Sequence, residues 1–320
     1  MNNLQNNQLN NNRDYDYEID LSEFFHMLWD KIFYIGATTS IFLLISITYA
    51  LMLPNVYKSE ALMMPMEKDA GMSGMLEQYG GIASLAGISL PSESASKSQE
   101  AIARIQSFKF FSDHFLPNIM LENLLAVKRW NPEGNTLAYN KSDFNSESRQ
   151  WVRKVRPPKS TIPSSQEAYE KYREILMVSE DKKTQFVALS VEHESPFIAQ
   201  QWAELIIDQI DQSMRAQDRE TATKSIEYLN SLAPTINYEE IKKALSSLQH
   251  GQMKRLMMVE ANEDYIFKML DSPVAPEMKS EPRRSLIVIL GTILGAMLSI
   301  FGVIAFDYFK KTTQHNKSSV

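Results

Sequence analysis

Residues 272–311 read SPVAPEMKSEPRRSLIVILGTILGAMLSIFGVIAFDYFKK, and this stretch decides the fold of the chain. Within it, residues 285–306 are twenty-two consecutive uncharged residues. As a helix they would cover about 33 Å, because an α-helix rises 1.5 Å per residue, and the hydrocarbon core of a bilayer is roughly 30 Å thick. The stretch therefore predicts a membrane-spanning helix.

Small residues recur along this span and predict a close helix partner. Gly291, Gly295 and Ser299 are four residues apart, so they share one face of the helix. Small side chains on one face let a second helix backbone approach closely. Simple helix packing would explain this face, but we expect it to contribute to assembly.

Three prolines precede the span: Pro273, Pro276 and Pro282. Proline lacks an amide donor and restricts the residue before it, which favours an extended segment. We therefore predict an extended strap that leads into the bilayer. Arg283 and Arg284 follow the strap and mark the boundary with water.

A second uncharged run of twenty-two residues lies near the other end of the chain, at residues 32–53. It is longer than the apolar core of a secretory signal and follows the acidic segment DYDYEID, so we interpret it as a retained membrane anchor. A buried core helix is the alternative for both runs, and their lack of charge argues against it. Two crossings place both termini on the same side of the membrane.

Composition says little about class and orientation. The 320 residues are 44% hydrophobic with a net charge of -6, which is ordinary for a globular chain. The acidic balance argues against a nucleic-acid partner, and the absence of cysteine fits any redox compartment. Basic residues near the membrane are balanced between the two sides, but short tails weigh more than a long translocated domain, which favours cytoplasmic termini.

These features predict an α+β membrane protein in which two terminal transmembrane helices flank an α/β base domain on the far side of the membrane, with a projecting long helical hairpin. A cytoplasmic tail and amphipathic lead-in form residues 1–31, the spans are 32–53 and 285–306, and a second tail is 307–320. The large domain between the spans, 54–284, divides into a base (54–197 and 261–271), a helical extension (198–260) and the proline strap (272–284).

Apolar periodicity predicts the elements of the base and the hairpin. We expect strands at 55–65, 173–178, 185–193 and 265–270, with the first and last strands paired, and a helix at 98–115. A long helix over 195–232 ends before Pro234 and is followed by a return helix that Gly251 softens. The long helix is polar nearly all round at 211–225, so we expect this flank to lack an intramolecular partner and Arg215 and Arg219 to contact a neighbouring subunit.

Two further segments could each be a ligand-binding site or an ordinary surface segment. The glycine-rich stretch 66–98 lacks the features of a phosphate-binding loop and is interpreted as a flexible loop under a neighbour. The segment WVRKVRPPK, residues 151–159, interleaves basic residues with tryptophan. It fits a polyanion or saccharide site, but a solvated basic face is the favoured interpretation.

Catalytic motifs are not found in the sequence. The five histidines form no HExxH pair, and there is no GxSxG elbow, no phosphate-binding GxxxxGK[ST] loop and no cysteine nucleophile. The acidic residues around His193 in VEHES could form a catalytic pair, but an exposed turn is favoured. We therefore predict no catalytic residue, no metal, no cofactor and no enzymatic activity.

The two-span plan and the stretch ANEDYIFKMLDSPVAPEMKSEPRRSLIVILGTILG resemble the Wzz chain length determinant family of polysaccharide co-polymerases. The stretches GGIASLAGI and EIDLSEFF are similar to that family as well. The resemblance covers nearly the whole chain and implies that the motif positions are the strap prolines and the glycines of the second span: Pro273, Pro276, Pro282, Gly291 and Gly295.

The resemblance also implies a function. Members are inner-membrane proteins whose periplasmic domains, here residues 54–284, assemble into ring-shaped homo-oligomers and set the length of O-antigen or related glycans made by a Wzy-type polymerase. The partners implied are the chain itself, that polymerase, the bilayer and the growing lipid-linked glycan. A scaffold of polysaccharide export, coupled to a separate tyrosine kinase, is the alternative. A glycan polymerase fits less well, because two spans leave little room for a substrate channel.

Overall fold

The computed structural model describes residues 28–66, 97–235, 238–262 and 264–317. The chain forms two compact units. The helical unit comprises Met1–Leu53 and Arg283–Val320, and the mixed unit comprises Pro54–Pro282. The predicted glycine-rich loop lies almost entirely outside the described residues, and so does the N-terminal tail.

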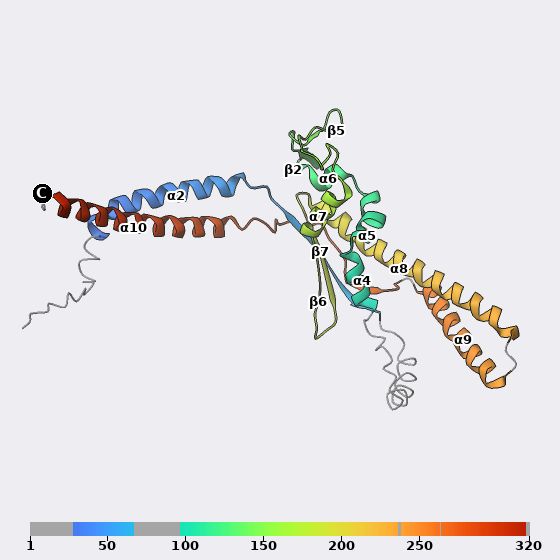
Figure 1. Cartoon of the computed structure of the whole chain (residues 1–320). Coiled ribbons are helices and arrows are strands. Elements are labelled where there is room, and N and C mark those ends of the chain that lie inside the picture. The colour runs from blue at the N-terminus through green and yellow to red at the C-terminus, as the bar shows by residue number, and fades with distance from the viewer. Residues whose placement is uncertain (1–27, 67–96, 236–237, 263, 318–320) are drawn as a thin grey trace, which may run out of the picture. The chain divides into compact units, whose positions relative to one another are not determined.

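The helical unit is a pair of helices, α2 (Ile32–Met52) and α10 (Arg284–Lys317), that lie side by side (Figure 1). By length and composition both are able to cross a membrane, α10 over Arg284–Phe306. Large apolar side chains such as Leu44 and Phe301 are exposed on them, which is compatible with membrane anchoring. Helix α10 continues past the apolar run, because the polar residues that follow include no proline or glycine.

The mixed unit is built on a four-stranded antiparallel sheet with the order β6-β7-β1-β8. The strands are β1 (Tyr57–Pro65), β6 (Leu176–Glu180), β7 (Val187–His193) and β8 (Phe267–Asp271). The first and last strands pair directly, as the sequence predicts. Alternate side chains of β1 and β7 are buried, so one face of the sheet points into the core.

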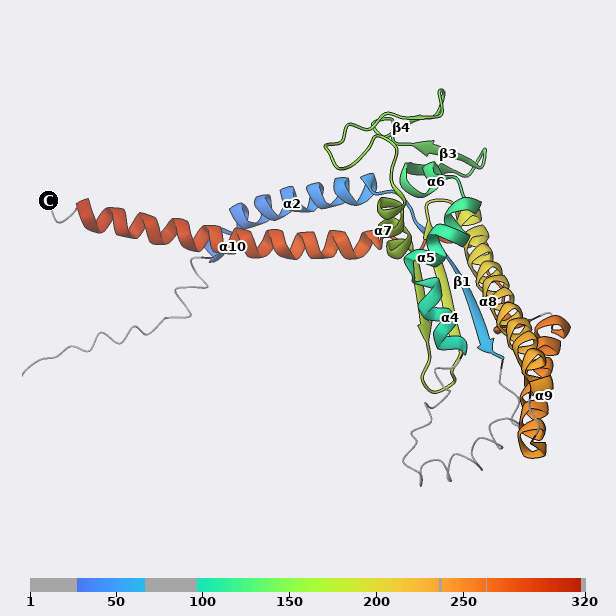
Figure 2. The ribbon, with the colours of Figure 1, turned by 45° about the vertical axis from the view of Figure 1, so that its right-hand side comes forward.

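Helices cover this buried face (Figure 2). They are α4 (Lys97–Ile105), α7 (Ser165–Ile175) and the first half of α8 (Pro196–Leu232). An aromatic cluster fills the space between them, with Tyr172 5.0 Å from Phe111 and 4.8 Å from Phe115 between ring centroids, and Phe115 5.6 Å from Trp202. Burial of each such ring contributes about 1.5–3 kcal/mol, so this cluster anchors the helices to the sheet.

The predicted helix at 98–115 is divided. After α4, Ser107 starts a new turn, since its Oγ accepts a hydrogen bond from the Phe110 backbone N–H at 3.2 Å. The turn α5 (Phe108–Phe110) runs into a π-helical segment, η1 (Phe111–Phe115), and then η2 (Leu116–Asn118). This geometry brings both Phe111 and Phe115 against Tyr172, which a single regular helix pattern did not predict.

Residues 121–151, for which the sequence predicts no regular element, contain a short helix and short strands. Helix α6 (Leu121–Leu125) is followed by two short hairpins, β2 (Val127–Asn131) with β3 (Thr136–Tyr139) and β4 (Phe144–Asn145) with β5 (Gln150–Trp151). Helix α7 was also missed, and its residues up to Ile175 include part of a predicted strand. Its apolar stripe is short, because only Ala168 and Tyr172 are buried.

Helices α8 and α9 (Glu239–Ala261) pack antiparallel (Figure 1). A 3-10 turn, η3 (Ala233–Thr235), ends the long helix at the predicted proline. The predicted softening at Gly251 is wrong, because α9 continues through this residue without interruption. A single glycine costs a helix only about 1 kcal/mol, and packing against α8 offsets that cost.

Candidate functional site

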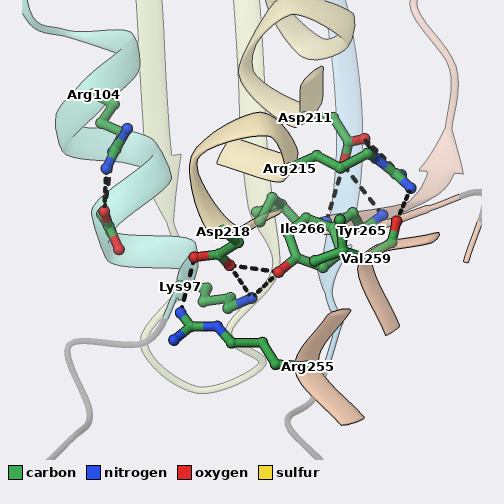
Figure 3. A network of polar contacts seen from close by, with 10 residues as sticks. Lys97, Arg104, Asp211, Arg215, Asp218, Arg255, Val259, Tyr265 and Ile266 are labelled. Carbon is green, nitrogen blue, oxygen red and sulfur yellow. Dashed lines mark hydrogen bonds and ion pairs between the residues drawn. The ribbon is translucent and has the colours of Figure 1, made fainter. Parts of the chain in front are cut away.

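Asp218 of α8 is the centre of a polar network that joins three helices to the segment before β8 (Figure 3). Its Oδ2 accepts hydrogen bonds from Lys97 Nζ, at 2.7 Å, and from the Tyr265 hydroxyl. Its Oδ1 accepts a hydrogen bond from Arg255 Nη2 at 2.8 Å. Because Lys97 starts α4 and Arg255 belongs to α9, one carboxylate fastens the helix pair α8–α9 to the base.

A second carboxylate, Asp211, extends the network by two turns of α8 (Figure 3). Its Oδ1 accepts from the backbone N–H of Tyr265 at 3.1 Å, and its Oδ2 accepts from Arg215 Nη2 at 2.9 Å. Arg215 Nη1 in turn donates to the carbonyl oxygens of Val259, at 2.8 Å, and Asn262, at 2.7 Å. Helix ends leave carbonyls without partners, so Arg215 caps the C-terminus of α9.

Arg219 makes a bidentate pair with Glu260 across the two helices. Its Nε and Nη2 donate to the two carboxylate oxygens at 2.5 Å and 3.0 Å. Both side chains are about half exposed, at 49% and 53%, so solvent screens this pair and it adds little stability.

The prediction that the polar flank 211–225 lacks an intramolecular partner is therefore wrong. Helix α9 supplies partners for Arg215 and Arg219, because its carbonyl end and Glu260 lie against the flank. The sequence pattern could not show this, since these partners are more than forty residues away along the chain. Contact of either arginine with a neighbouring subunit stays a prediction.

The charges of the network are fixed by their surroundings. Burial raises the pKa of Asp218, but hydrogen bonds from Lys97 and Tyr265 and the positive charges of Lys97 and Arg255 outweigh it, so the pKa lies below its usual value. Burial and the hydrogen bond to Asp218 raise the pKa of Tyr265. At neutral pH the site therefore holds the ionised Asp218 carboxylate between the cations Lys97 and Arg255. Lys97, Arg255 and the Tyr265 hydroxyl each donate a hydrogen bond to this carboxylate, which fits a role in positioning the helices.

The small-residue face of α10 lies against α2 of the same chain. A Cβ built on Gly291 would lie 1.9 Å from Ser46 Oγ, and one built on Gly295 would lie 2.4 Å from Phe42 Cβ. Real Cβ atoms do not approach other atoms so closely, so only glycine fits at these positions. The spacing correctly predicts a close helix partner, and that partner is the other apolar helix. A role of this face in assembly between chains stays a prediction.

The proline strap, predicted over 272–284, is an extended segment of the mixed unit up to Pro282, and Arg284 already begins α10. Ser59 Oγ of β1 donates to the Val274 carbonyl at 2.8 Å, and Gln200 Nε2 of α8 donates to the Pro273 carbonyl at 3.3 Å. Pro273 is buried, and the other two prolines, Pro276 and Pro282, are half-buried. Carbonyls of the strap are thus used as acceptors, while proline at these positions prevents the strap from forming a helix.

The end of the strap is tied to the start of β1. The Val56 N–H donates to the Glu281 carbonyl at 3.0 Å, and the Ser280 N–H donates to the Val56 carbonyl at 2.8 Å. In the helical unit, Arg284 Nη2 donates to the Leu53 carbonyl at 3.5 Å, while the Arg283 side chain is exposed. The entry and exit segments of the mixed unit therefore run next to each other.

His193 lies at the end of β7 and is buried, so the exposed turn expected for this segment is wrong at the histidine, while Glu192 and Glu194 on either side of it are half-buried. Its Nδ1 accepts a hydrogen bond from the Ser195 backbone N–H at 2.9 Å, and its Nε2 lies 2.9 Å from the Asn123 carbonyl oxygen. These partners require a neutral ring that carries its proton on Nε2. Burial lowers the pKa of His193 and outweighs the nearby Glu194 carboxylate, which raises it. His193 thus ties the end of β7 to the start of α8 and to α6.

We expect the stability of the mixed unit to fall as the pH is lowered from 7 to 5. In the unfolded chain His193 titrates near about 6.5, and in the folded chain its pKa is lower, so its contribution is present above the unfolded value and is lost as the pH falls through the folded one. Thermal unfolding of the full chain in detergent, followed by circular dichroism at several pH values, measures this. The variant His193→Gln should have a lower midpoint at pH 7 and a weaker pH dependence. An equal pH dependence in both proteins would contradict the assignment.

No group of three or more potential metal-ligating side chains is found within the described residues. Taken together, the fold and the site define a mixed α/β protein. It has two apolar terminal helices and a polar network that positions the helix pair α8–α9.

Residues 17–112 match the family model described as "Wzz: Chain length determinant protein". Over this region, which includes α2, β1 and α4, the chain is similar to the Wzz family of chain length determinant proteins, and the predicted resemblance is confirmed. The matched region does not include the proline strap or α10. A search of curated proteins gave no match.

Two solved structures are similar to this chain. A "full-length bacterial polysaccharide co-polymerase" aligns with 91% of this chain and 99% of its own, at 14% identity and a TM-score of 0.40. A "Fragment of WzzB, Polysaccharide Co-polymerase from Salmonella Typhimurium" aligns with 71% of this chain and 100% of its own, at 12% identity and a TM-score of 0.29. At these scores the alignments add no argument to the family match.

Proposed function

We propose that this chain regulates the length of O-antigen or a related surface polysaccharide, as an oligomeric inner-membrane co-polymerase that acts with a Wzy-type polymerase. The observation that carries the proposal is the match of residues 17–112 to the chain length determinant family. The two apolar helices support it, because a partner of a membrane-embedded polymerase needs an anchor in the same bilayer.

The proposal assigns separate tasks to the two units. The helical unit anchors the chain, and the mixed unit lies in the periplasm, where the chains form a ring. The prolines of the strap, with Arg283 and Arg284, connect the units at the membrane surface. Both arginines have partners in α9, but Arg219 is the better of the two for contact with a neighbouring subunit, because its side chain is 49% exposed and that of Arg215 only 20%.

Complementation tests the proposed function. A strain that lacks its own chain length determinant but keeps its polymerase should gain a clustered glycan length distribution when the full chain is expressed, as seen by electrophoresis of the surface polysaccharide. The double charge reversal Arg215→Glu with Arg219→Glu should shift the cluster to another length and leave polymer present. A distribution that stays random with the unaltered chain present in the membrane would favour the alternative, a scaffold of polysaccharide export.

The orientation is tested with single cysteines, since the chain has none of its own. Ser165 is exposed at the start of α7 in the mixed unit, so Ser165→Cys should react with a membrane-impermeant maleimide in cells with a permeabilised outer membrane. Ser318→Cys should react only after the inner membrane is opened. The reverse labelling pattern would overturn the proposed orientation.

A further inference from the structure

A pocket of about 720 Å³ lies beside the hairpin β4–β5 and the segment that leads from it to α7. This volume is within the range of pockets that bind small ligands, roughly 300–1,000 Å³. The side chains that matter for its chemistry are those of Lys141, Asp143, Trp151, Arg153, Lys154 and Pro163. The pocket therefore gathers three cations around a tryptophan, in the basic segment that the sequence had offered as a polyanion or saccharide site.

Two of these cations are available to a ligand. Lys141 and Lys154 are exposed, and no hydrogen bond or ion pair involves their ammonium groups within the part of the chain that the structure describes. Arg153 is committed, because it donates to Glu167 at 2.5 Å and to the carbonyls of Ser160 and Thr161 at 2.8 and 2.9 Å. It thereby fixes the loop before α7.

The aromatic surface of the pocket is also held in place. Trp151 is half-buried and contacts Phe144 edge to face, with 5.3 Å between ring centroids. Phe144 is itself buried and contacts Tyr139 at 5.3 Å. A ring that is packed from behind loses little conformational entropy when a ligand covers its remaining surface, so this site is preorganised.

Asp143 also lines the pocket, and its charge is opposite to that of the two lysines. Its Oδ2 accepts a hydrogen bond from Asn140 Nδ2 at 2.7 Å. An acceptor carboxylate suits the hydroxyl groups of a ligand, which are donors, and it repels a phosphate, which carries more negative charge, more strongly than a single carboxylate. The pocket thus offers a ring for an apolar face, two cations for an acidic group and an acceptor for hydroxyl groups.

We propose that this pocket binds a carboxylate-bearing saccharide segment. The C–H face of a pyranose ring would cover Trp151, its carboxylate would lie between Lys141 and Lys154, and a hydroxyl group would donate to Asp143. The choice of a glycan as the source of this chemistry rests on the proposed function. Binding itself can be measured without any assumption about glycan length.

The test uses the full chain in detergent and tetragalacturonic acid as the probe, with titration calorimetry as the readout. The double variant Lys141→Glu with Lys154→Glu should bind the probe weaker by about tenfold or more, because both cations that meet the carboxylates are reversed. The matched control is Lys182→Glu with Lys183→Glu. It makes the same change of charge at exposed residues of the turn between β6 and β7, away from the pocket, and should change affinity less than about twofold.

Two further ligands define what is recognised. Maltotetraose, which has the same length but no carboxylate, should bind the unaltered chain about tenfold weaker than the acidic probe, and inorganic phosphate at equal concentration should not displace the probe. Equal losses in the two double variants, displacement by phosphate, or no binding of the probe would each overturn the proposal. These results would leave the proposed function intact, because glycan length distribution in cells is measured separately.

Discussion

Replacing Gly291 and Gly295 together with leucine is expected to separate α10 from α2 within each chain. Even one added Cβ would lie 1.9 Å from Ser46 Oγ at the first position and 2.4 Å from Phe42 Cβ at the second, so neither leucine fits. Close packing is the main force that joins helices in lipid, and a larger side chain at the contact increases the distance between axes within the usual range of about 8–10 Å. We expect a displacement of about 2 Å with a broader spread of distances.

Spin labels measure this displacement directly. Ile41→Cys in α2 and Met297→Cys in α10 place labels at exposed positions of the otherwise cysteine-free chain. Double electron–electron resonance in lipid should show one narrow distance distribution for the parent chain and a broad, longer one for the double leucine variant. Gly302→Leu is the control, because a Cβ added there meets nothing within 4 Å beyond its chain neighbours and the backbone of its own helix. Identical distributions for the parent and the double variant would show that the contact is absent in lipid.

The second large effect is expected from Asp218→Asn. The amide has no charge to offset Lys97 and Arg255, which then lie near each other around a part-buried position whose native side chain is only 14% exposed. Removal of one partner from a buried ion pair costs about 3–5 kcal/mol, and partial exposure of both cations reduces this to about 2–3 kcal/mol. The attachment of α9 to α8 and α4 should weaken by that amount.

Hydrogen exchange with mass spectrometry reports this attachment. Backbone amides in the last turns of α9 should exchange about 50-fold faster in Asp218→Asn than in the parent chain, since each 1.4 kcal/mol corresponds to about a tenfold change. Glu220→Gln is the matched control, because it removes a carboxylate of the same helix whose pair with Lys224 is exposed to solvent. Exchange in α9 should be unchanged in the control. Equal exchange in the parent and Asp218→Asn would show that the network does not hold the helix pair.

The elements that the sequence predicted well are those with a long, uniform pattern. The two uncharged runs are uniformly apolar over a membrane-spanning length. Clear periodicity with a proline or a charge at the boundary marks the β1 and β7 strands and the helix that begins at Ser195–Pro196. The pairing of the first strand with the last was also predicted from the sequence, because each of the two strands is close in sequence to one of the membrane anchors. Short elements with few buried residues, such as α7 and the hairpin β4–β5, have too little pattern to be predicted.

The polar network was not predictable in the same way. Lys97 and Asp218 are 121 residues apart, and Tyr265 is 47 residues from Asp218, so no local spacing relates them. On a helical wheel α8 simply becomes polar after residue 211, which is equally typical of a solvated face and of a face that meets a partner with complementary charges. Only the antiparallel packing of α9 decides between these interpretations.

The glycine face shows a related limit. Its spacing predicted a close contact correctly but could not say whether the partner lies in the same chain, because a stripe of small residues looks the same in both cases. His193 was misread for the opposite reason. Its place at the end of a strand suggested an exposed turn, whereas strand alternation places the histidine in the core.

Deletion of the gene, with measurement of both the total mass and the length distribution of the surface polysaccharide, tests the proposal that this chain sets polymer length and does not make polymer. Polymer mass should stay near the parent value while the clustered distribution becomes random, since the polymerase is still present. Complete loss of polymer at normal polymerase levels would contradict the proposal, and so would a length distribution identical to that of the parent strain.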